Sequence, residues 1–323
     1  MIIYVYVPNY FCTHYLPFLL YRNALTEILM IKYAPFFQML PDLRYISQLN
    51  EIVITCSYLI VTVESVSNNI EEFMPLMAKF GDRCIVANTE HHAHNPKCII
   101  ESARRIGTKL TFFEYSGINY KYLKENCPHI NTVYIPPLYH PIYETYYNFN
   151  IDGHIPWEHK DIDVLFYGYI NDRRKNVLDA LSQKFKVVVP KFSISPEGND
   201  SLCHLIERSK VVLNIYFYDY NKVYDYYRNS FVIANKGLLI AEKHDNQDDE
   251  IEYNMKGCED VLVLSEYDQI VPTVCKYIHK SNDEIRDIVD KQYKWFKKYP
   301  MTDFIVPFFD KMQMQMRYRI VMK

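Results

Sequence analysis

The chain has 323 residues, of which 49% are hydrophobic and 23% charged, and its formal net charge at pH 7 is −3. This length allows two folded domains, each with its own hydrophobic core. The small net charge gives no electrostatic basis for binding nucleic acid or an anionic membrane surface, so we expect neither as a partner.

The first half of the chain alternates strand-like apolar runs with segments of helical spacing. Strands are predicted at 2–7, 52–55, 59–63, 83–87, 109–113 and 133–135. Helices are predicted at 16–31, 70–80, 98–106 and 116–125, the last with Ser116 as its N-cap. Residues 141–159 are rich in Tyr, Asn, His and Pro without a clear period, and we interpret them as the crossover between two domains.

The second half continues the same alternation. Strands are predicted near 163–167, 186–189, 211–216, 238–241 and 261–264, and helices near 174–184, 201–209, 225–236, 266–279 and 283–298. Short buried strands alternating with helices indicate parallel sheets with helices on both faces. We therefore predict an α/β protein with two Rossmann-like domains facing a cleft, with ligands beyond the carboxyl ends of the strands.

The predicted domains are 1–150 and 151–300. Residues 301–323 carry Phe, Val and Met at loosely helical spacing and are expected to form a closing helix that packs back on the first domain.

The cysteines and apolar stretches indicate a cytoplasmic location. None of the eight cysteines forms a C-x-x-C pair, which is typical of reduced thiols in a cytosolic protein rather than of a zinc ribbon. The longest apolar stretch, 52–63, is too short to span a bilayer, and the first residues lack the basic region of a signal peptide.

A basic turn follows the first strand of the second half, in DIDVLFYGYINDRRKNVLDAL. The strand ends at Gly168, and Arg173, Arg174 and Lys175 stand at the start of the following helix. Free N–H groups at a helix start and guanidinium forks both suit a phosphate, so this turn predicts a diphosphate site. The alternative interpretation is a solvated cluster of charges, although cations at a helix start oppose the helix dipole.

Arg228 and Glu242 are the next candidates. Glu242 stands where the strand 238–241 ends, and a carboxylate there suits two ribose hydroxyls, while Arg228 suits phosphate or sugar. The alternative is that these side chains form ion pairs with each other or with neighbours.

Glu90, His91, His92 and His94 follow the strand 83–87 and fall at the ligand edge of the first sheet. His and Glu serve as general bases near neutral pH. A metal site and a merely polar loop are the alternatives, and adjacent histidines rarely ligate one ion together.

The chain has no G-x-G-x-x-G after its first strand, no P-loop lysine motif and no G-x-S-x-G elbow, which disfavours an NAD enzyme, a kinase and an α/β-hydrolase.

The second half resembles the C-terminal domain of GT-B-fold glycosyltransferases in three segments: DIDVLFYGYINDRRKNVLDAL, LIERSKVVLNIYFYD and YRNSFVIANKGLLIAE. Together with IVANTEHH, FFEYSGINYKYL and VYIPPLYHP, they are similar to the CgeB-like group and to glycosyltransferases of large DNA viruses. The resemblance covers most of residues 80–300, and its strength lies in the order and spacing of the segments.

The resemblance implies transfer of a sugar from a UDP- or GDP-linked donor to an acceptor hydroxyl on a glycan, a protein or a small molecule. The donor would lie by Gly168, Arg173, Arg174, Lys175, Arg228 and Glu242. Glu90, His91 or His92 would lie at the reacting centre. No tightly bound metal or cofactor is implied, because cationic side chains and a helix dipole stabilise the leaving diphosphate. A viral member would act in the host cytoplasm.

The chain departs from the family pattern at two positions. Many retaining members carry two glutamates eight positions apart before the last nucleotide-binding strand, whereas here Val232 stands at the second position and no Glu stands at the first. Either Glu242 takes over this role, or donor binding differs, or activity is lost. Two alternatives therefore stay open: a catalytically inactive GT-B-like binding or structural protein, and another sugar-nucleotide enzyme of GT-B shape, such as an epimerase.

Overall fold

The computed structural model describes residues 2–6, 42–46, 57–145, 155–190, 202–220, 222–244, 256–308 and 310–311. These residues form two compact units. The first unit holds the described residues up to Pro136 together with those from Met301 onward, and the second holds those from Pro137 to Pro300. None of the helices in the described part of the chain combines the length and hydropathy that a membrane span requires.

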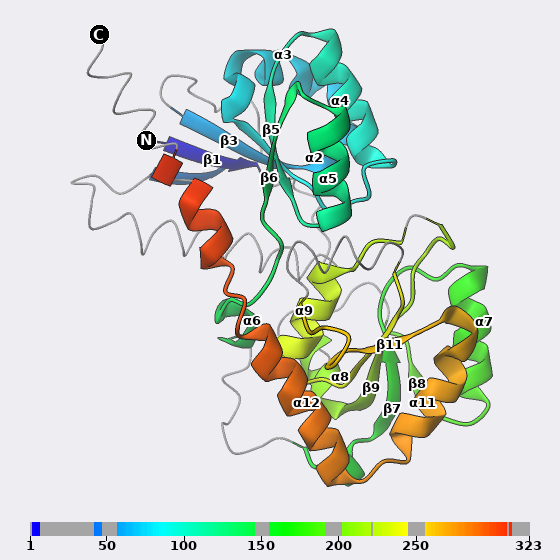
Figure 1. The fold of residues 1–323 in the computed structure, drawn as a ribbon. Coiled ribbons are helices and arrows are strands. Elements are labelled where there is room, and N and C mark those ends of the chain that lie inside the picture. Colours follow the sequence, from blue (N-terminus) through cyan, green and yellow to red (C-terminus); the bar gives the residue numbers. More distant parts are fainter. Residues whose placement is uncertain are drawn as a thin grey trace. The chain divides into compact units, whose positions relative to one another are not determined.

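The first unit is built on a six-stranded sheet in the order β2-β1-β3-β4-β5-β6, with every neighbouring pair parallel (Figure 1). The strands are β1 (Ile2–Tyr6), β2 (Asp42–Ile46), β3 (Ser57–Thr62), β4 (Cys84–Ala87), β5 (Leu110–Glu114) and β6 (Ile130–Tyr134). Every residue of β4 and β5 is buried, as expected for the centre of a parallel sheet whose two faces are both covered.

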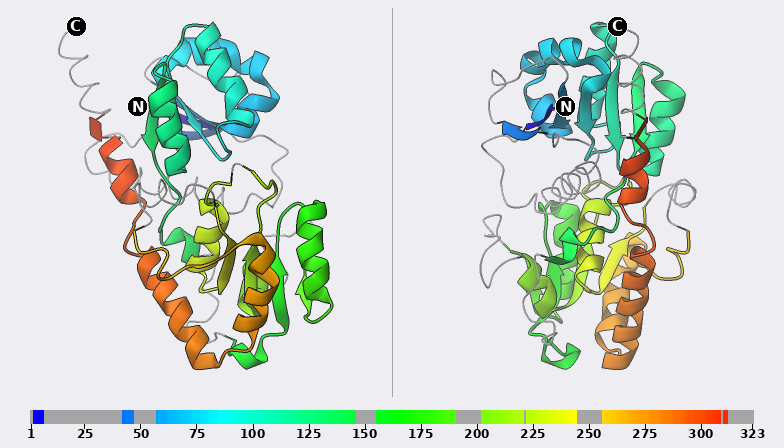
Figure 2. Two further views of the ribbon diagram at one scale, coloured as in Figure 1. Left: turned by 45° about the vertical axis from the view of Figure 1, so that its right-hand side comes forward. Right: turned by 90° about the vertical axis from the view of Figure 1, so that its left-hand side faces the viewer.

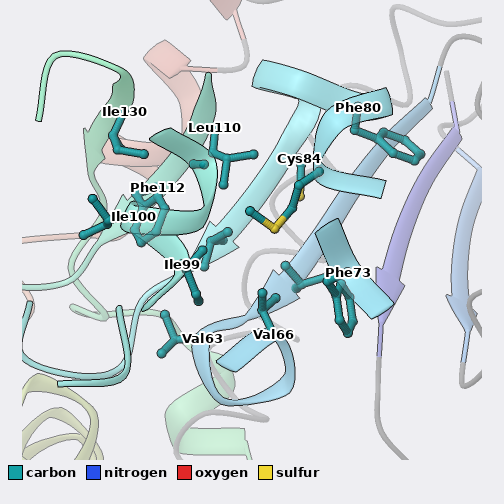
Figure 3. Packing of buried hydrophobic residues seen from close by; sticks show 14 of the residues in the cluster. Val63, Val66, Phe73, Phe80, Cys84, Ile99, Ile100, Leu110, Phe112 and Ile130 are labelled. Carbon is teal, nitrogen blue, oxygen red and sulfur yellow. The ribbon is translucent and has the colours of Figure 1, made fainter. Parts of the chain in front are cut away.

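The helices of the first unit are α2 (Val63–Asn68), α3 (Ile70–Phe80), α4 (Asn95–Arg105) and α5 (Gly117–Asn126), with a single 3₁₀ turn, η4 (Gly81–Arg83). They bury apolar side chains against alternate residues of the central strands (Figure 3). In this core Phe73 and Phe80 of α3 pack near Cys84 of β4, while Ile99 of α4 packs near Phe112 of β5.

Residues 302–308 are helical and belong to the first unit, drawn in red in Figure 2. Phe304 makes an edge-to-face contact with Tyr134 of β6, and Phe308 makes one with Phe113 of β5. Met301 and Ile305 are fully buried, and the two aromatic contacts attach this segment to the sheet.

The second unit has a five-stranded parallel sheet in the order β11-β10-β9-β7-β8. The strands are β7 (Ile162–Phe166), β8 (Val187–Val188), β9 (Ser209–Asn214), β10 (Leu239–Glu242) and β11 (Val263–Ser265). The helices are α6 (Ile142–Thr145), α7 (Asp172–Ser182), α8 (Leu202–Arg208), α9 (Tyr226–Ala234), α11 (Ile270–Ile278) and α12 (Asn282–Phe296), with 3₁₀ turns η5 (Trp157–His159) and η6 (Tyr267–Gln269).

Local sequence explains where the helices of the second unit begin. Asn171 caps α7 by accepting from the Arg174 N–H, and α12 opens with a capping box between Ser281 and Glu284. One apolar cluster then joins α7, α11 and α12 to the sheet, with Leu181, Val274 and Ile285 among its buried members.

The predicted α/β fold is confirmed, and most predicted elements lie within a few residues of the observed ones. Strand β2 was not predicted, and β6 begins three residues before the predicted strand. Asn131 and Thr132 in β6 interrupt the apolar pattern from which the strand was predicted. The predicted helix 16–31 and strand 52–55 lie outside the described residues.

Candidate functional site

Three strands of the second unit end side by side. β7, β9 and β10 are neighbouring parallel strands, so Phe166, Asn214 and Glu242 at their carboxyl ends lie along one edge of the sheet. The residues predicted to bind the donor follow or end these strands: Gly168 lies in the turn after β7, the basic residues 173–175 lie at the start of α7, Arg228 lies in α9, and Glu242 ends β10.

Gly168 forms a turn directly after β7 in a conformation that L-residues avoid, with φ of +143°. A Cβ atom placed on Gly168 would lie 3.1 Å from Nη2 of Arg228 and 3.5 Å from Nη1 of Arg174. The two guanidinium groups therefore converge on the one residue of the turn that has no side chain.

Arg174 is buried, and backbone carbonyl groups fix its position. Its Nε–H donates to the Ile215 carbonyl oxygen (2.8 Å), and Nη1 donates to the Tyr169 carbonyl oxygen (2.6 Å). The rings of Phe166 and Phe217 each lie 5.3 Å from the guanidinium carbon. Nη2 of Arg174 has no hydrogen-bond partner among the described residues. Burial lowers the pKa of Arg174, and the like charge of Arg228 lowers it further.

Arg228 is held by a chain of polar groups. Nη1 donates to Oδ1 of Asn214 (2.9 Å), and Nδ2 of Asn214 donates to Oδ1 of Asn229 (2.8 Å). Asp225 caps α9 by accepting from the Arg228 N–H, and its carboxylate lies 3.5 Å from Nε of Arg228. Within the described ranges, Nη2 of Arg228 also lacks a hydrogen-bond partner. At the Gly168 turn the unpartnered Nη2 of Arg228 therefore lies near Nη1 of Arg174, which donates to Tyr169.

Arg173 and Glu242 form a two-pronged ion pair. Nη1 and Nη2 of Arg173 lie 2.7 and 2.5 Å from the two carboxylate oxygens of Glu242. The Tyr216 N–H donates to the same carboxylate (3.0 Å), and Nζ of Lys222 lies 3.6 Å away. The Arg173 guanidinium also stacks 3.9 Å from the centre of the Tyr267 ring.

Because of this ion pair, two neighbouring arginines of the basic turn have different partners: Arg173 pairs with Glu242, whereas Arg174 lies at the Gly168 turn. The sequence left two interpretations of Glu242 open, a ribose contact or an ion pair. The structure shows an ion pair, and the partner of Glu242 is Arg173 rather than Arg228. Glu242 is only 1% exposed, so its carboxylate holds Arg173 in place. The ribose contact predicted for Glu242 stays a prediction.

Lys175 lies apart from these groups. Its side chain is 60% exposed and pairs with Asp179 one turn further along α7.

Val232 is fully buried in the core of the second unit, and a Cβ atom placed on Gly237 would lie 2.9 Å from its side chain. The position at which the resemblance implied a glutamate is therefore a packing position in this chain.

The loop after β4 in the first unit carries the predicted catalytic residues. Asn88 directly follows the strand and holds the backbone of Glu90 at both ends. Its Nδ2 donates to the Glu90 carbonyl oxygen (2.8 Å), and its Oδ1 accepts from the Glu90 N–H (3.0 Å). Nδ2 of Asn88 also lies 2.8 and 3.0 Å from the two carboxyl oxygens of Glu114, which is wholly buried at the end of β5. Burial raises the pKa of Glu114 to about 8, although hydrogen bonds from Asn88 and Asn119 act in the opposite direction.

The three histidines of this loop lie close together. The rings of His91 and His92 are 4.1 Å apart, and those of His91 and His94 are 5.5 Å apart. Burial lowers the pKa of both His92 and His94. Across the described residues, no group of three or more His, Cys, Asp or Glu side chains is arranged to hold a metal ion.

Sequence reasoning missed Asn88 and Glu114. The signal for Glu114 was an acidic residue directly after the apolar run LTFF, because a charged residue in a buried strand requires polar partners. For Asn88 the corresponding signal was its position immediately after the strand CIVA.

No protein-family model and no curated protein sequence matches this chain, whereas solved structures match it along almost its full length. A mutant of phage T4 BGT in complex with UDP-glucose has a TM-score of 0.57 at 11% identity, covering 95% of this chain and 98% of that chain. An E. coli trehalose-6-phosphate protein bound with UDP-2-fluoro glucose has a TM-score of 0.51 at 9% identity, covering 96% and 98%. The N-terminal domain of Candida albicans trehalose-6-phosphate phosphatase has a TM-score of 0.52 at 8% identity, covering 96% of each chain. These similarities confirm the GT-B fold that the sequence predicted.

Proposed function

We propose that this protein is a glycosyltransferase that takes a sugar from a UDP- or GDP-linked donor and transfers it to a hydroxyl group of an acceptor. The observation that carries the proposal is the pair of guanidinium groups, Arg174 and Arg228, that meet at the Gly168 turn, where Nη2 of Arg228 has no hydrogen-bond partner among the described residues. Two cations side by side repel each other, and an anion between them replaces this repulsion with charge-assisted hydrogen bonds.

The diphosphate of the donor binds at this turn, at the edge where ligands of open parallel sheets are found. Backbone and amide contacts fix both guanidinium groups before any ligand arrives. Because the donors are already oriented, they stabilise the charge that develops on the leaving diphosphate with little reorganisation.

In the reaction, the acceptor oxygen forms a bond to the anomeric carbon while the bond from that carbon to the diphosphate oxygen breaks. The electron pair leaves with the nucleoside diphosphate, and the acceptor proton passes to a base. We assign the base to the loop containing Glu90, His91 and His92 in the first unit, and the acceptor is a glycan, a protein or a small molecule. Cationic side chains fulfil the role of a metal at the diphosphate.

The T4 BGT and E. coli structures hold UDP-glucose and UDP-2-fluoro glucose, which supports UDP-sugars as the first donors to test. We assign the chain to the CgeB-like and viral group of glycosyltransferases, acting in the cytoplasm, or in the host cytoplasm if the protein is viral.

A thermal-shift screen with UDP, GDP and their sugars, each with and without a chelator, tests this proposal. UDP or GDP is expected to raise the melting temperature by mass action, and the chelator is expected to leave the shift unchanged. The double substitution Arg173→Ala with Arg174→Ala is expected to abolish the shift. A chain that no nucleotide stabilises would not be a glycosyltransferase of this kind.

Turnover separates the enzyme from the inactive alternative. The expected result is release of UDP or GDP from the cognate nucleotide-sugar, faster in the presence of an acceptor. Nucleotide binding without any turnover would favour a binding protein that has kept the fold. The buried Val232 is the observation that makes this second candidate worth testing.

A further inference from the structure

Asn119, the third residue of α5, is buried and contacts the loop that carries the predicted base. Its Nδ2 donates to the Glu90 carbonyl oxygen (2.9 Å), and its Oδ1 accepts from the His92 backbone N–H (3.0 Å). A carbonyl oxygen only accepts and a backbone N–H only donates. The two backbone groups therefore fix which end of the Asn119 amide is oxygen.

This orientation determines the protonation of His92. Nδ1 of the His92 ring lies 3.1 Å from the same Oδ1 of Asn119. Because that oxygen has no proton to give, Nδ1 must carry one, and in the neutral ring Nε2 then holds the free electron pair.

The neighbouring His91 has the opposite arrangement. Its Nδ1 accepts a hydrogen bond from the Ala93 backbone N–H (3.1 Å), so the proton of the neutral His91 ring lies on Nε2. His91 is also only 7% exposed. Of the two predicted catalytic histidines, only His92 has its Nε2 available as a proton acceptor.

Other contacts hold the His92 ring in place. It stacks on Tyr122 with the ring centres 3.7 Å apart and the planes 13° apart. Asn88 also holds the Glu90 backbone, and its Nδ2 donates to the same carbonyl oxygen as Asn119 does, so two amides fix the chain directly before the histidines. Burial lowers the pKa of His92, which favours the neutral ring that a base requires.

We propose that Asn119 is a positioning residue that holds His92 in its Nδ1–H form, so that Nε2 of His92 takes the proton of the acceptor hydroxyl. The assignment of the base rests on the proposed glycosyl transfer, whereas the protonation of His92 does not. In the transfer step the acceptor proton moves to Nε2 and forms an imidazolium ion. The acceptor oxygen bonds to the anomeric carbon, and the diphosphate leaves with the electron pair of the broken bond.

Nitrogen-15 NMR of histidine-labelled protein tests the proposed protonation of His92 without any substrate. Spectra recorded at about pH 8, above the pKa of an ordinary imidazole, distinguish the protonated from the unprotonated ring nitrogen. The His92→Gln variant identifies the signals of His92. We expect Nδ1–H for His92 and Nε2–H for His91 in the wild-type protein, and an Nε2–H ring at His92 would overturn the proposal.

Two substitutions of Asn119 extend this test. Asn119→Leu removes the acceptor oxygen and is expected to reduce the Nδ1–H population of His92, whereas Asn119→Asp retains an acceptor and is expected to keep it. An unchanged His92 spectrum in the Asn119→Leu protein would overturn the positioning role. The wild-type spectrum decides the protonation of His92 even if the leucine variant does not fold.

Kinetic measurements test whether His92 takes the proton of the acceptor hydroxyl. With the donor that gives turnover, His92→Gln is expected to lower kcat by about 10²- to 10⁴-fold, and Asn119→Leu by at least about tenfold, each with little change in donor KM. Asn119→Asp is expected to restore part of the loss. Full activity of His92→Gln would show that His92 is not the base, while absence of turnover from the wild type would contradict the proposed function and leave the NMR result valid.

Discussion

The buried guanidinium of Arg174 lies beside that of Arg228, and burial first and the like charge of Arg228 second lower the pKa of Arg174. An arginine remains protonated at neutral pH in spite of such a shift. The protein therefore keeps two positive charges together at the turn after β7, an arrangement that an anionic ligand stabilises.

Gly168→Ala is expected to impair both stability and nucleotide binding. An L-residue at a φ of +143° is strained, which costs about 1–3 kcal/mol of stability. The new methyl group would also lie 3.1 Å from Nη2 of Arg228. Gly257→Ala is a matched control, because Gly257 also has a positive φ of +77°, but no described atom lies within 4 Å of the position its new methyl group would take. Urea unfolding and a UDP titration are expected to show a stability loss in both variants and lost binding only in Gly168→Ala. Normal UDP affinity of folded Gly168→Ala would contradict this account of the turn.

Glu242→Gln is expected to destabilise the second unit by about 3–5 kcal/mol. The substitution removes the negative charge that faces Nη1 and Nη2 of Arg173, and the positive charge of this arginine is then uncompensated. Glu266→Gln is the control, because Glu266 is 60% exposed and its pairing with Lys243 is worth at most about 1 kcal/mol. Denaturant unfolding of both variants checks this prediction, and equal losses of stability would show that the Arg173–Glu242 pair has no special role.

Glu114→Gln is expected to change how stability depends on pH. The pKa of Glu114 is about 8 in the folded protein and about 4.5 in its ordinary state, so the folded protein binds more protons between these values. Its contribution to the free energy of unfolding is therefore fully present below about pH 4.5 and is lost as the pH rises through about 8. Glu114→Gln removes this decline, whereas Glu101→Gln at an exposed position of α4 retains it. Urea unfolding across this pH range checks the prediction, and parallel curves for wild type and Glu114→Gln would contradict it.

The sequence indicated which edge of the second sheet carries the polar candidate residues, because apolar runs mark buried parallel strands and polar residues follow them. Gly168, Arg174 and Arg228 lie together there, as expected for residues at the ends of neighbouring strands. Sequence reasoning did not separate Arg173 from Arg174. Adjacent residues on a helix point about 100° apart, and only the structure shows which one faces Glu242.

The loop after β4 illustrates a different limit. Its histidines were identified by residue type, but the protonation that we propose for His92 depends on Asn119, 27 positions away in the chain. Glu114 likewise contacts Asn88 across 26 positions, and no local pattern reports such a pairing. Long-range polar contacts of this kind become visible only when the sheet brings the strand ends together.

The most direct test of the central claim is calorimetric titration of the protein with UDP, comparing wild type, Arg228→Met and Lys175→Met. Arg228→Met removes one of the two guanidinium groups at the turn, while Lys175→Met removes an exposed charge of the same basic segment. The account predicts that UDP binds wild type and Lys175→Met equally, and that Arg228→Met binds at least about tenfold more weakly, a loss of about 1.4 kcal/mol. Equal UDP affinity in all three proteins would contradict it. A wild-type protein that binds neither UDP nor GDP would also contradict it.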